Sequence, residues 1–414
     1  MEVRKGYKQS EVGVIPEDWK IKILRDLSTL ITKGTTPKKF SDSGINYIKI
    51  ECLDGDKINI EKCLYIDDNT NKTELKRSIL NEGDLLFAIA GATIGKCTFI
   101  TNEIIPANTN QALSIIRLKD EENKMFVFYN LKSAAMQKYI IDNIAGGAQP
   151  NLNLEQIGNF CLPLPPTKSE QTAIATVLSD ADALITSLEK LIEKKRAIKQ
   201  GAMQELLNPK EGWEVKRLGE IADILTGFPF PSSGYSKTGI RLLRGSNIKR
   251  GNTDWNENIC QYWPRVTAEL LRYQLNYGDI VVAMDGSLVG KSFAQLSQLD
   301  LPGILLQRVA RIRSTVIDIN YLKELVCSEM FTGYCDSVKT SSAIPHISPA
   351  DICNYNIRYP LEKSEQTRIA SILSDMDVEI TALEQKLGKY KLIKQGMMQE
   401  LLTGKIRLNQ DLQD

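Results

Sequence analysis

The chain has 414 residues, a length that predicts about two to three domains, each large enough to bury its own core. Hydrophobic residues make up 42% and charged residues 25%, which excludes disordered and fibrous classes of protein. With 52 basic and 51 acidic residues the net charge is +1, so contact with a polyanion has to come from local patches of charge.

Features that the sequence lacks narrow the function further. The segment MEVRKGYKQSEVGVIPEDW has no apolar signal region, and no apolar run approaches the roughly 18 residues of a membrane span, so we expect a cytoplasmic protein without membrane contact. The eight cysteines are scattered without a Cys-x-x-Cys pair, which predicts reduced thiols and no metal site. His346 is the only histidine, so a Ser-His-Asp triad would have to use this one residue, and multi-histidine metal sites are excluded.

Residues 1–165 form the first predicted globular domain. The runs INYIKI from Ile45 and DLLFAIA from Asp84 predict strands, and clusters of Gly, Asn, Asp and Ser between such runs predict loops. The stretch MFVFYNLKSAAMQKYI from Met125 predicts a helix. This mixture indicates an α+β domain.

Residues 166–208 form a long predicted helix. Thr167 and Glu170 make a capping-box pattern directly after two prolines, which is typical of a helix start. About 38 residues at about 1.5 Å each would give a rod of about 57 Å. Apolar residues recur at alternating steps of four and three, the period of a coiled-coil seam, at Ile174, Leu178, Ala181, Ile185, Leu188 and Ile192.

Residues 209–360 form the second predicted globular domain. The runs IRLLRG from Ile240 and DIVVAM from Asp279 predict strands, and the stretch from Ile319 to Val338 predicts helix. The loop GDIVVAMDGSLVGK from Gly278 matches GDLLFAIAGATIGK from Gly83 in the first domain. We therefore predict a second α+β domain that is related to the first.

Residues 361–406 repeat the long helix, and residues 407–414 are a predicted tail. At an offset of 195 positions, 24 of 39 aligned residues are identical between Ser169–Leu207 and Ser364–Leu402. The chain is therefore a tandem duplication. The second copy repeats the seam at Ile369, Leu373, Met376, Ile380, Leu383 and Leu387.

The two long helices predict how the domains are joined. Either helix alone would expose its apolar seam to water, so we expect the two to pack on each other as an antiparallel coiled coil. The fold class is then α+β, with two globular α/β domains related by pseudo-twofold symmetry. In the alternative arrangement, each helix packs independently on its own domain.

Each predicted domain contains a glycine-rich loop that ends in lysine. The loop from Gly286 to Ser292 resembles a phosphate-binding P-loop, but its spacing is one residue short and the copy from Gly91 to Cys97 lacks the Ser/Thr. We therefore expect either a packing role for these glycines or contact of Lys96 and Lys291 with a nucleic-acid phosphate. Nucleotide hydrolysis is disfavoured.

The candidate DNA-binding residues are basic or amide side chains in the two globular domains. Arginine and lysine suit guanine edges and phosphates, and glutamine suits adenine. For each residue, a solvated surface charge or a local ion pair is the competing interpretation. The candidates are Lys33, Lys38, Lys39, Lys96, Gln111, Arg117, Arg241, Arg244, Lys249, Arg250, Lys291, Gln307, Arg311 and Arg313.

Catalytic motifs are missing from the sequence. We find neither a nuclease arrangement of carboxylates and lysine nor the Asn/Asp-Pro-Pro-aromatic motif of adenine methyltransferases. His346 is expected to satisfy loop backbone groups and not to act in catalysis. The chain is therefore predicted to be non-catalytic.

Taken together, these residues resemble the specificity subunit of type I restriction-modification enzymes over nearly the whole chain. The resemblance lies in the two SEQ-x-x-I…LSD-x-D runs that end in IKQG-x-MQELL, the Gly-Asp…Gly-Lys loop of each half, VIPEDW from Val14, and LLTGKIRL after Glu400.

The resemblance implies two target recognition domains, each of which reads one half of a split sequence in double-stranded DNA. It also implies that the coiled coil sets the spacer between the half-sites and docks two methyltransferase subunits. A motor-nuclease subunit can then join. This chain would hold no cofactor, because S-adenosylmethionine, ATP and Mg would belong to those partner subunits.

Two other functions stay open from the sequence. A two-lobed coiled-coil scaffold for protein or carbohydrate ligands would share the duplication but would show no salt-dependent DNA binding. The specificity half of a fused nuclease is disfavoured, because no segment of the chain is left for a nuclease.

Overall fold

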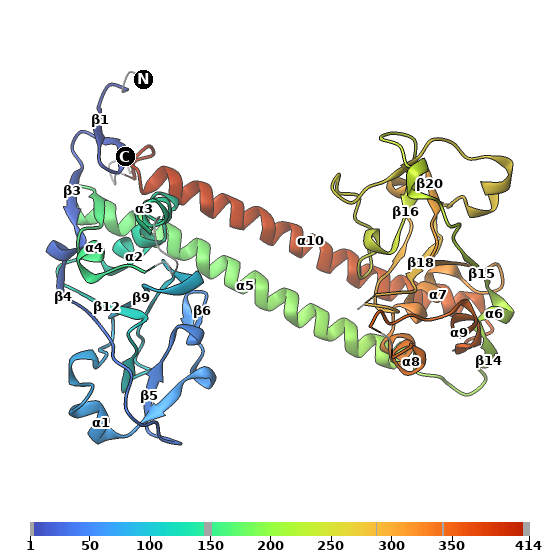
Figure 1. The fold of residues 1–414 in the computed structure, drawn as a ribbon, viewed down its shortest axis with the longest axis horizontal. Helices are drawn as coiled ribbons and strands as arrows, with labels where there is room; N and C mark the ends of the chain where they lie inside the picture. Colours follow the sequence, from blue (N-terminus) through green and yellow to red (C-terminus); the bar gives the residue numbers. More distant parts are fainter. Residues whose placement is uncertain (1–3, 145–150, 287, 342, 409–414) are drawn as a thin grey trace. The chain divides into compact units, whose positions relative to one another are not determined.

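The computed structural model describes residues 4–144, 151–286, 288–341 and 343–408, and the chain divides into two compact units. Unit 1 combines residues 1–189 with residues 385–414, and unit 2 spans residues 190–384. Each unit therefore contains one globular segment together with part of both long helices. The mixture of sheets and helices confirms the predicted α+β class (Figure 1).

The strands of unit 1 form two principal sheets. The antiparallel sheet has the order β10-β9-β12-β4 and consists of Cys97–Phe99, Leu85–Ala88, Leu113–Leu118 and Ser28–Lys33. The mixed sheet has the order β11-β5-β8 and consists of Ala107–Thr109, Ile45–Ile48 and Leu64–Ile66. The small two-stranded pairs are β1 (Tyr7–Ser10) with β2 (Gly13–Pro16), β3 (Lys20–Ile23) with β13 (Cys161–Leu164), and β6 (Leu53–Asp54) with β7 (Lys57–Ile58).

The strands of unit 2 repeat this topology. The antiparallel sheet β15-β21-β18-β19 consists of Asp223–Thr226, Val309–Arg313, Ile280–Ala283 and Phe293–Gln295, and so matches β4-β12-β9-β10. The mixed sheet β17-β16-β20 consists of Tyr262–Trp263, Ile240–Leu243 and Gly303–Leu305, and β14 (Glu214–Arg217) pairs with β22 (Asn356–Tyr359). The duplication therefore extends through both folds, although the sequences of the globular segments share little.

Short helices cover one face of each antiparallel sheet. In unit 1 they are α2 (Lys124–Lys132), α3 (Ala134–Ile144) and α4 (Leu154–Gly158), whereas α1 (Asp68–Lys72) contacts the mixed sheet, where Asn108 of β11 donates to Asn71. In unit 2 they are α6 (Leu218–Ile221), α7 (Ile319–Val326), α8 (Glu329–Val338) and α9 (Pro349–Asn354). Where the sequence predicts one helix from Met125, the chain breaks at Ser133, whose extended backbone ends α2. A second break falls at Ser328, the N-cap of α8.

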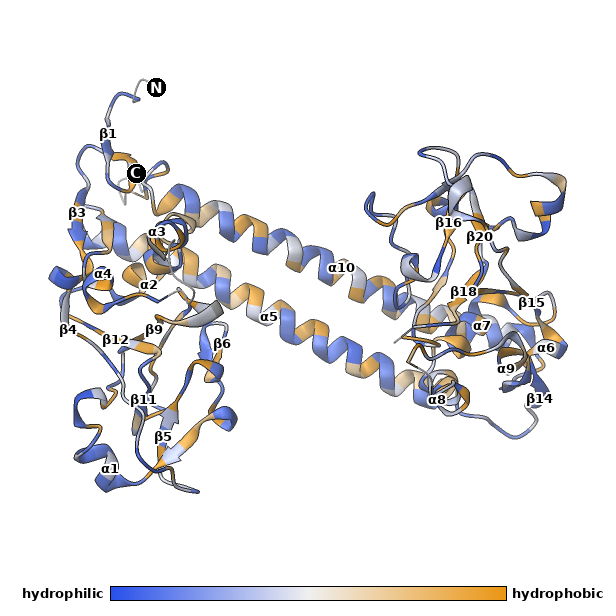
Figure 2. Ribbon diagram, in the orientation of Figure 1, coloured by the Kyte–Doolittle hydropathy of each residue, from blue (hydrophilic) through white to orange (hydrophobic). Residues whose placement is uncertain are grey.

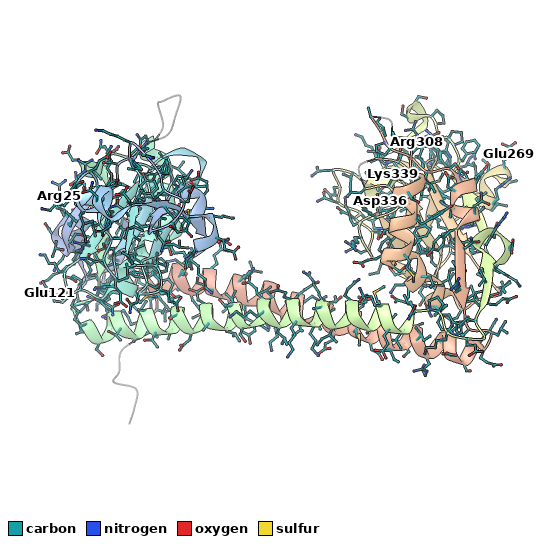
Figure 3. The ribbon with its side chains drawn as sticks, turned by 90° about the horizontal axis from the view of Figure 1, so that it is seen from below. Arg25, Glu121, Glu269, Arg308, Asp336 and Lys339 are labelled. Atoms are coloured by element: carbon teal, nitrogen blue, oxygen red, sulfur yellow. The ribbon has the colours of Figure 1, made fainter. Side chains whose placement is uncertain are left out.

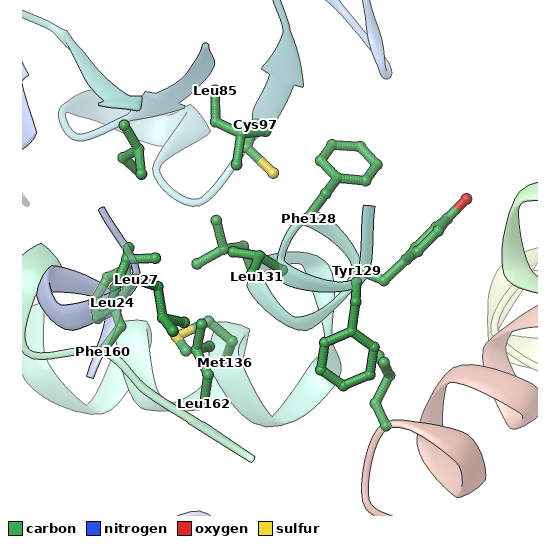
Figure 4. Packing of buried hydrophobic residues seen from close by; sticks show 14 of the residues in the cluster. Leu24, Leu27, Leu85, Cys97, Phe128, Tyr129, Leu131, Met136, Phe160 and Leu162 are labelled. Carbon is green, nitrogen blue, oxygen red and sulfur yellow. The ribbon is translucent and has the colours of Figure 1, made fainter. Parts of the chain in front are cut away.

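Alternation along the central strands separates two cores in each unit. In β9, Leu85 and Phe87 pack with α2, α3 and α4, whereas Leu86 and Ala88 face the mixed sheet. In unit 1 the antiparallel sheet therefore lies between a helical layer and the mixed sheet, with the helices on the side of the long helices (Figure 1). Figure 4 shows the helix-side core around Leu27, Leu131 and Phe160.

The long helices are α5 (Lys168–Leu206) and α10 (Lys363–Leu401). Thr167 accepts a hydrogen bond from the Glu170 amide at 3.2 Å, as the capping pattern predicts. Apolar residues recur among polar ones along both helices (Figure 2). All twelve seam residues are buried or half-buried.

Within each unit the two helices run antiparallel. In unit 2, Lys199 pairs with Asp377 and Lys195 with Glu379, so residue numbers fall along α5 as they rise along α10. In unit 1, Lys391 pairs with Glu189 and Lys394 with Asp182 in the same sense. The first turns of each helix also belong to a globular core, through Ile174 and Leu178 in unit 1 and Ile369 and Leu373 in unit 2. The predicted coiled coil and the alternative of packing on a domain thus both describe part of each helix.

The segment after α10 packs against the beginning of the chain. Arg407, in the predicted tail, forms ion pairs with Glu170 and Asp18 and lies over the Trp19 ring at 5.8 Å. The Tyr7 hydroxyl donates to the Gly404 carbonyl at 3.1 Å. These contacts stabilise unit 1 through two segments at opposite ends of the sequence.

Candidate nucleic-acid interface

Polar side chains of unit 1 gather where β4 and β11 end. Lys33 ends β4, and the loop that follows carries Lys38 and Lys39; all three lysines are exposed. In the same loop the Thr36 hydroxyl donates to Gln111 Oε1 at 2.6 Å. Gly34 lets the loop approach the β11 backbone, because a Cβ there would lie 1.9 Å from the Thr109 carbonyl oxygen. We call residues 33–40 and 110–112, together with Arg77, loop cluster 1.

The equivalent loops of unit 2 have different chemistry. The loop after β15 reads Gly227-Phe228-Pro229-Phe230, and the backbone N–H of Gln307 donates to the Phe228 carbonyl at 3.0 Å. Gly227 again permits close approach, because a Cβ there would lie 2.2 Å from the Leu306 backbone. We call residues 227–235 and 306–308, together with Asp285, loop cluster 2.

Loop cluster 2 presents two exposed side chains from one turn. The Gln307 side chain has no hydrogen-bond partner among the described residues, and Arg308 pairs with Asp285 at 2.9 Å while its side chain stays 66% exposed. Arg308 has a φ of 67°, the only positive value of a non-glycine residue in the described ranges. Such backbone strain is typical of functional positions. In Figure 3 Arg308 lies on the part of unit 2 that projects away from its long helices.

Three of the candidate arginines form ion pairs with carboxylates of their own unit. Arg117 makes a bidentate pair with Asp84, with both nitrogen to oxygen distances at 2.7 Å. Arg313 pairs in the same way with Asp279, and Arg311, whose side chain is 3% exposed, pairs with Asp223. The hydrogen bond to Asp84 raises the pKa of Arg117, and the one to Asp279 raises the pKa of Arg313.

The two charged pairs in the sheets are equivalent in the two units. Asp84 and Asp279 directly precede β9 and β18, and each also accepts a hydrogen bond from a backbone amide, that of Asn81 or Asn276. Their partner arginines lie near the ends of β12 and β21, whereas Gln111 and Gln307 precede the starts of those strands. The structure therefore does not bring these arginines together with the glutamines.

The other candidates of unit 2 are distributed along and beyond β16. Arg241 donates to the Leu299 carbonyl and lies 5.2 Å from the Trp255 ring, and Arg244 donates to the Ile259 carbonyl. Lys249 contacts the Ser246 carbonyl and pairs loosely with Asp254 at 3.7 Å. Arg250 is exposed in the following loop.

The glycine-rich loops are turns between neighbouring strands. In unit 2, a Cβ on Gly290 would lie 2.4 Å from the Cys335 Cβ, which explains why glycine is needed against α8. Lys291 pairs with Asp336 at 2.9 Å. Lys96 is exposed and forms no ion pair with another described residue.

Two arginines of the loop clusters were missed by the sequence analysis. Arg77 donates to the Thr35 hydroxyl at 2.9 Å, and Arg308 neighbours Gln307 in the chain. Only the Gln307-Arg308 dipeptide gave a sequence signal, because both residue types suit base edges. The backbone N–H of His346 donates to the Thr340 hydroxyl, and the His346 ring bonds the same hydroxyl, which is a side-chain group and not one of the backbone groups that the sequence predicts.

The described residues also give information on metal sites, disulfides and membrane-spanning helices. The side chains placed there include no group of three or more His, Cys, Asp or Glu suited to a metal ion. All eight cysteines are free thiols. Among the helices of the described residues, none is both long and apolar enough to cross a bilayer.

Comparison with known proteins identifies relatives for both halves of the chain. The family described as "Type I restriction modification DNA specificity domain" matches residues 16–200 and again residues 210–394. The type I restriction enzyme MjaVIII specificity subunit of Methanocaldococcus jannaschii is 28% identical, with 97% of this chain and 96% of the relative covered. The EcoAI specificity subunit of Escherichia coli is 32% identical over 200 residues, which cover 44% of this chain and 33% of the relative.

Two solved structures have a similar fold. A chain from a study of complex assembly and conformational transition of the type I restriction-modification system gives a TM-score of 0.60 at 17% identity, covering 95% of this chain and 99% of that one. The S subunit of a type I restriction-modification system from M. genitalium gives 0.58 at 15% identity, covering 97% and 98%.

Proposed function

The chain belongs to the family of type I restriction modification DNA specificity domains, and on this premise we propose that each unit reads one half of an asymmetric sequence in double-stranded DNA. As a specificity subunit with two target recognition domains, the chain has a role in recognition and not in catalysis. The observation that carries the proposal is the pair of loop clusters, which occupy equivalent ends of duplicated sheets but present different side chains.

Loop cluster 1 favours phosphate contact combined with limited base reading. Its three exposed lysines suit phosphates, and Gln111 adds an amide whose Oε1 already accepts from Thr36. Arg77 extends the positive charge beside Thr35. We assign these residues to the first half-site.

Loop cluster 2 favours base reading. Gln307 suits the N6/N7 edge of adenine and Arg308 suits the O6/N7 edge of guanine. The aromatic side chains of Phe228 and Phe230 pack with each other at 5.0 Å between ring centroids, and Phe230 packs with Trp263 at 4.7 Å. The turn is therefore supported by a cluster of packed aromatic rings. We assign Gln307 and Arg308 to the second half-site.

The contacts that the remaining candidate residues make within the protein separate those that hold the sheets together from those that stay available for DNA. Arg117 and Arg313 stabilise the sheets in this proposal, because moving them to DNA would leave the buried Asp84 and Asp279 without a charged partner. Arg311 is held as well, because its own side chain is only 3% exposed. Lys96, Lys249 and Arg250 stay candidates for phosphate contact. Arg241, Arg244 and Lys291 would have to give up contacts within unit 2.

The long helices would set the distance between half-sites and dock the partner subunits. We propose two methyltransferase subunits, which supply S-adenosylmethionine, and a motor-nuclease subunit, which uses ATP and Mg. The repeated sequence of α5 and α10, with 24 of 39 aligned residues identical, supports two equivalent docking positions. No cofactor is assigned to this chain.

A salt titration combined with methylation mapping tests the proposal. The chain co-expressed with its methyltransferase subunit should methylate adenine at one bipartite sequence, and the complex should bind that DNA less tightly as salt rises. Methylation by the purified chain alone would contradict the assigned role. Absence of DNA binding at low salt would favour the scaffold for protein or carbohydrate ligands.

A further inference from the structure

Two aspartates in the long helices occupy equivalent positions and have equivalent contacts. We propose that Asp182 and Asp377 are positioning residues that hold each recognition domain in a fixed orientation on its helix pair, so that the accepted spacer between half-sites depends on them. The inference rests on the proposed function for its consequence in DNA, but its structural part can be tested without DNA.

In unit 1, Asp182 joins three elements. Its Oδ2 accepts a hydrogen bond from the Tyr129 hydroxyl of α2 at 2.8 Å, and its Oδ1 accepts from Lys394 Nζ of α10 at 2.5 Å. Lys394 Nζ also lies 5.5 Å from the centre of the Tyr129 ring. We call these three residues the first aspartate junction.

Tyr129 transmits this contact to the interior of the recognition domain. The residue is 1% exposed and belongs to the helix-side core of unit 1. Figure 4 shows that its hydroxyl points away from that core. Burial and the bond to Asp182 both raise the pKa of Tyr129, so the hydroxyl stays a donor throughout the physiological range.

In unit 2, Asp377 is the residue equivalent to Asp182, because the two differ by the repeat offset of 195. Its Oδ1 accepts from Lys199 Nζ of α5 at 2.5 Å, and its Oδ2 from Lys323 Nζ of α7 at 3.3 Å. Lys199 is in turn the equivalent of Lys394. Lys323, Asp377 and Lys199 form the second aspartate junction.

The division of the carboxylate oxygens is the same in both junctions. One oxygen binds a lysine of the other long helix, and the second binds a donor from the recognition domain. One planar carboxylate thereby binds the other long helix and the recognition domain at the same time, whereas an ion pair between the two helices alone would leave the domain unbound. The lysines are shielded, with side chains 13% and 18% exposed, so solvent screens these contacts less than surface ion pairs.

A second repeated ion pair supplies a matched control. Glu189 pairs with Lys391 in unit 1 and Glu384 with Arg196 in unit 2, again at equivalent positions. All four side chains are 41% exposed or more, and both pairs join only the two long helices. Their removal should leave the orientation of the domains unchanged.

The donor differs between the junctions. Tyr129 is neutral, whereas Lys323 is charged and also bonds Glu324 at 2.5 Å. Burial alone would lower the pKa of Lys323, but the carboxylates of Glu324 and Asp377 raise it on balance. Removing either donor should therefore loosen its own domain only.

Distance measurements within unit 1 test the structural part. Nitroxide amino acids at Glu61 and Ser187, both exposed, report the separation of the recognition domain from α5 in the full chain. Tyr129→Phe keeps the buried ring and removes only the hydroxyl, so the variant should fold. We expect broader distance distributions for Tyr129→Phe and Asp182→Ala and the parent distribution for Glu189→Ala. Unchanged widths in the first two, or equal broadening in all three, would overturn the proposal.

Methylation mapping tests the consequence for the spacer. With the methyltransferase subunit co-expressed, the parent chain should methylate sites of one spacer length. Asp182→Ala and Asp377→Ala should also methylate sites whose spacer differs by a single base pair, with both half-sites unchanged. A single spacer length in variants with broadened distances would refute the spacing role. If the parent methylates nothing, the proposed function fails, while the distance data still decide the structural inference.

Discussion

Units 1 and 2 share their framework and differ in their loops. Both antiparallel sheets have the same strand order, and both hold one charged pair, Asp84 with Arg117 or Asp279 with Arg313. The loop after the first strand of each sheet is cationic in unit 1, with Lys38 and Lys39, but aromatic in unit 2, with Phe228.

The difference shows where a duplicated domain can diverge. Buried pairs constrain both partners, because changing one leaves the other without compensation. Loop side chains that face solvent carry no such constraint. Two unlike readers on one framework are the expected result, and the following predictions test that separation.

The largest expected effect comes from removing the charged pairs of the sheets. Asp84→Ala and Asp279→Ala should each cost about 3 kcal/mol in the stability of their own unit, because an arginine and a backbone amide lose a buried acceptor. Hydrogen exchange of peptides from β9 and β18 measures each unit separately. Asp285→Ala, which breaks an exposed pair, is the control and should cost less than about 1 kcal/mol. Equal effects of all three variants would contradict the assignment.

An intermediate effect is expected from the loops. Arg308→Ala should reduce discrimination at one base of the second half-site by about 1–3 kcal/mol. Lys38→Ala with Lys39→Ala should weaken binding to all sequences and reduce the salt slope by about 0.9 for each phosphate that the protein no longer neutralises. Competition gel shifts at several salt concentrations separate the two results. If the lysine variants changed the base preference, the assignment of loop cluster 1 to phosphate contact would be wrong.

A smaller effect is expected when the pH is lowered, and it should be confined to unit 2. Burial alone would raise the pKa of Asp300, but hydrogen bonds from Thr253, Trp255 and Ser297 lower it below its ordinary value. A lowered pKa in the folded state stabilises the protein above the unfolded value of about 3.9, and this stabilisation disappears as pH falls through the lower folded value. The indole N–H signal of Trp255 should therefore shift only below about pH 4. Asp300→Asn should abolish that transition, and a transition that persists would exclude Asp300 as its source.

Much of the fold could be predicted from local patterns. The runs at Ile45, Asp84, Ile240 and Asp279 correspond to β5, β9, β16 and β18. The seam period and the Thr167 cap located α5 to within two residues of its observed start. Periodicity succeeds here because the repeats are long and each turn adds to the same signal. It does not detect the break at Ser133, which depends on how α2 and α3 pack.

The candidate interface was less predictable. Arg117 and Lys33 look alike in sequence, and only the folded chain shows that Arg117 meets Asp84, 33 positions away. Arg308 was missed because its strained backbone and its place beside Gln307 at the surface are properties of the turn. The sequence alone places Arg407 in a tail, because nothing local indicates its contact with Asp18, 389 positions away.

Substitution of the loop residues of one unit tests most directly whether each unit reads its own DNA half-site independently of the other. Replacing Gln307 and Arg308 with Asn and Ala in the chain co-expressed with its methyltransferase subunit, followed by long-read mapping of methylated adenine, reports both half-sites and the spacer at once. Independent readers predict an altered second half-site, with the first half-site and the spacer as in the parent. A change in both half-sites, or in the spacer, would contradict this account.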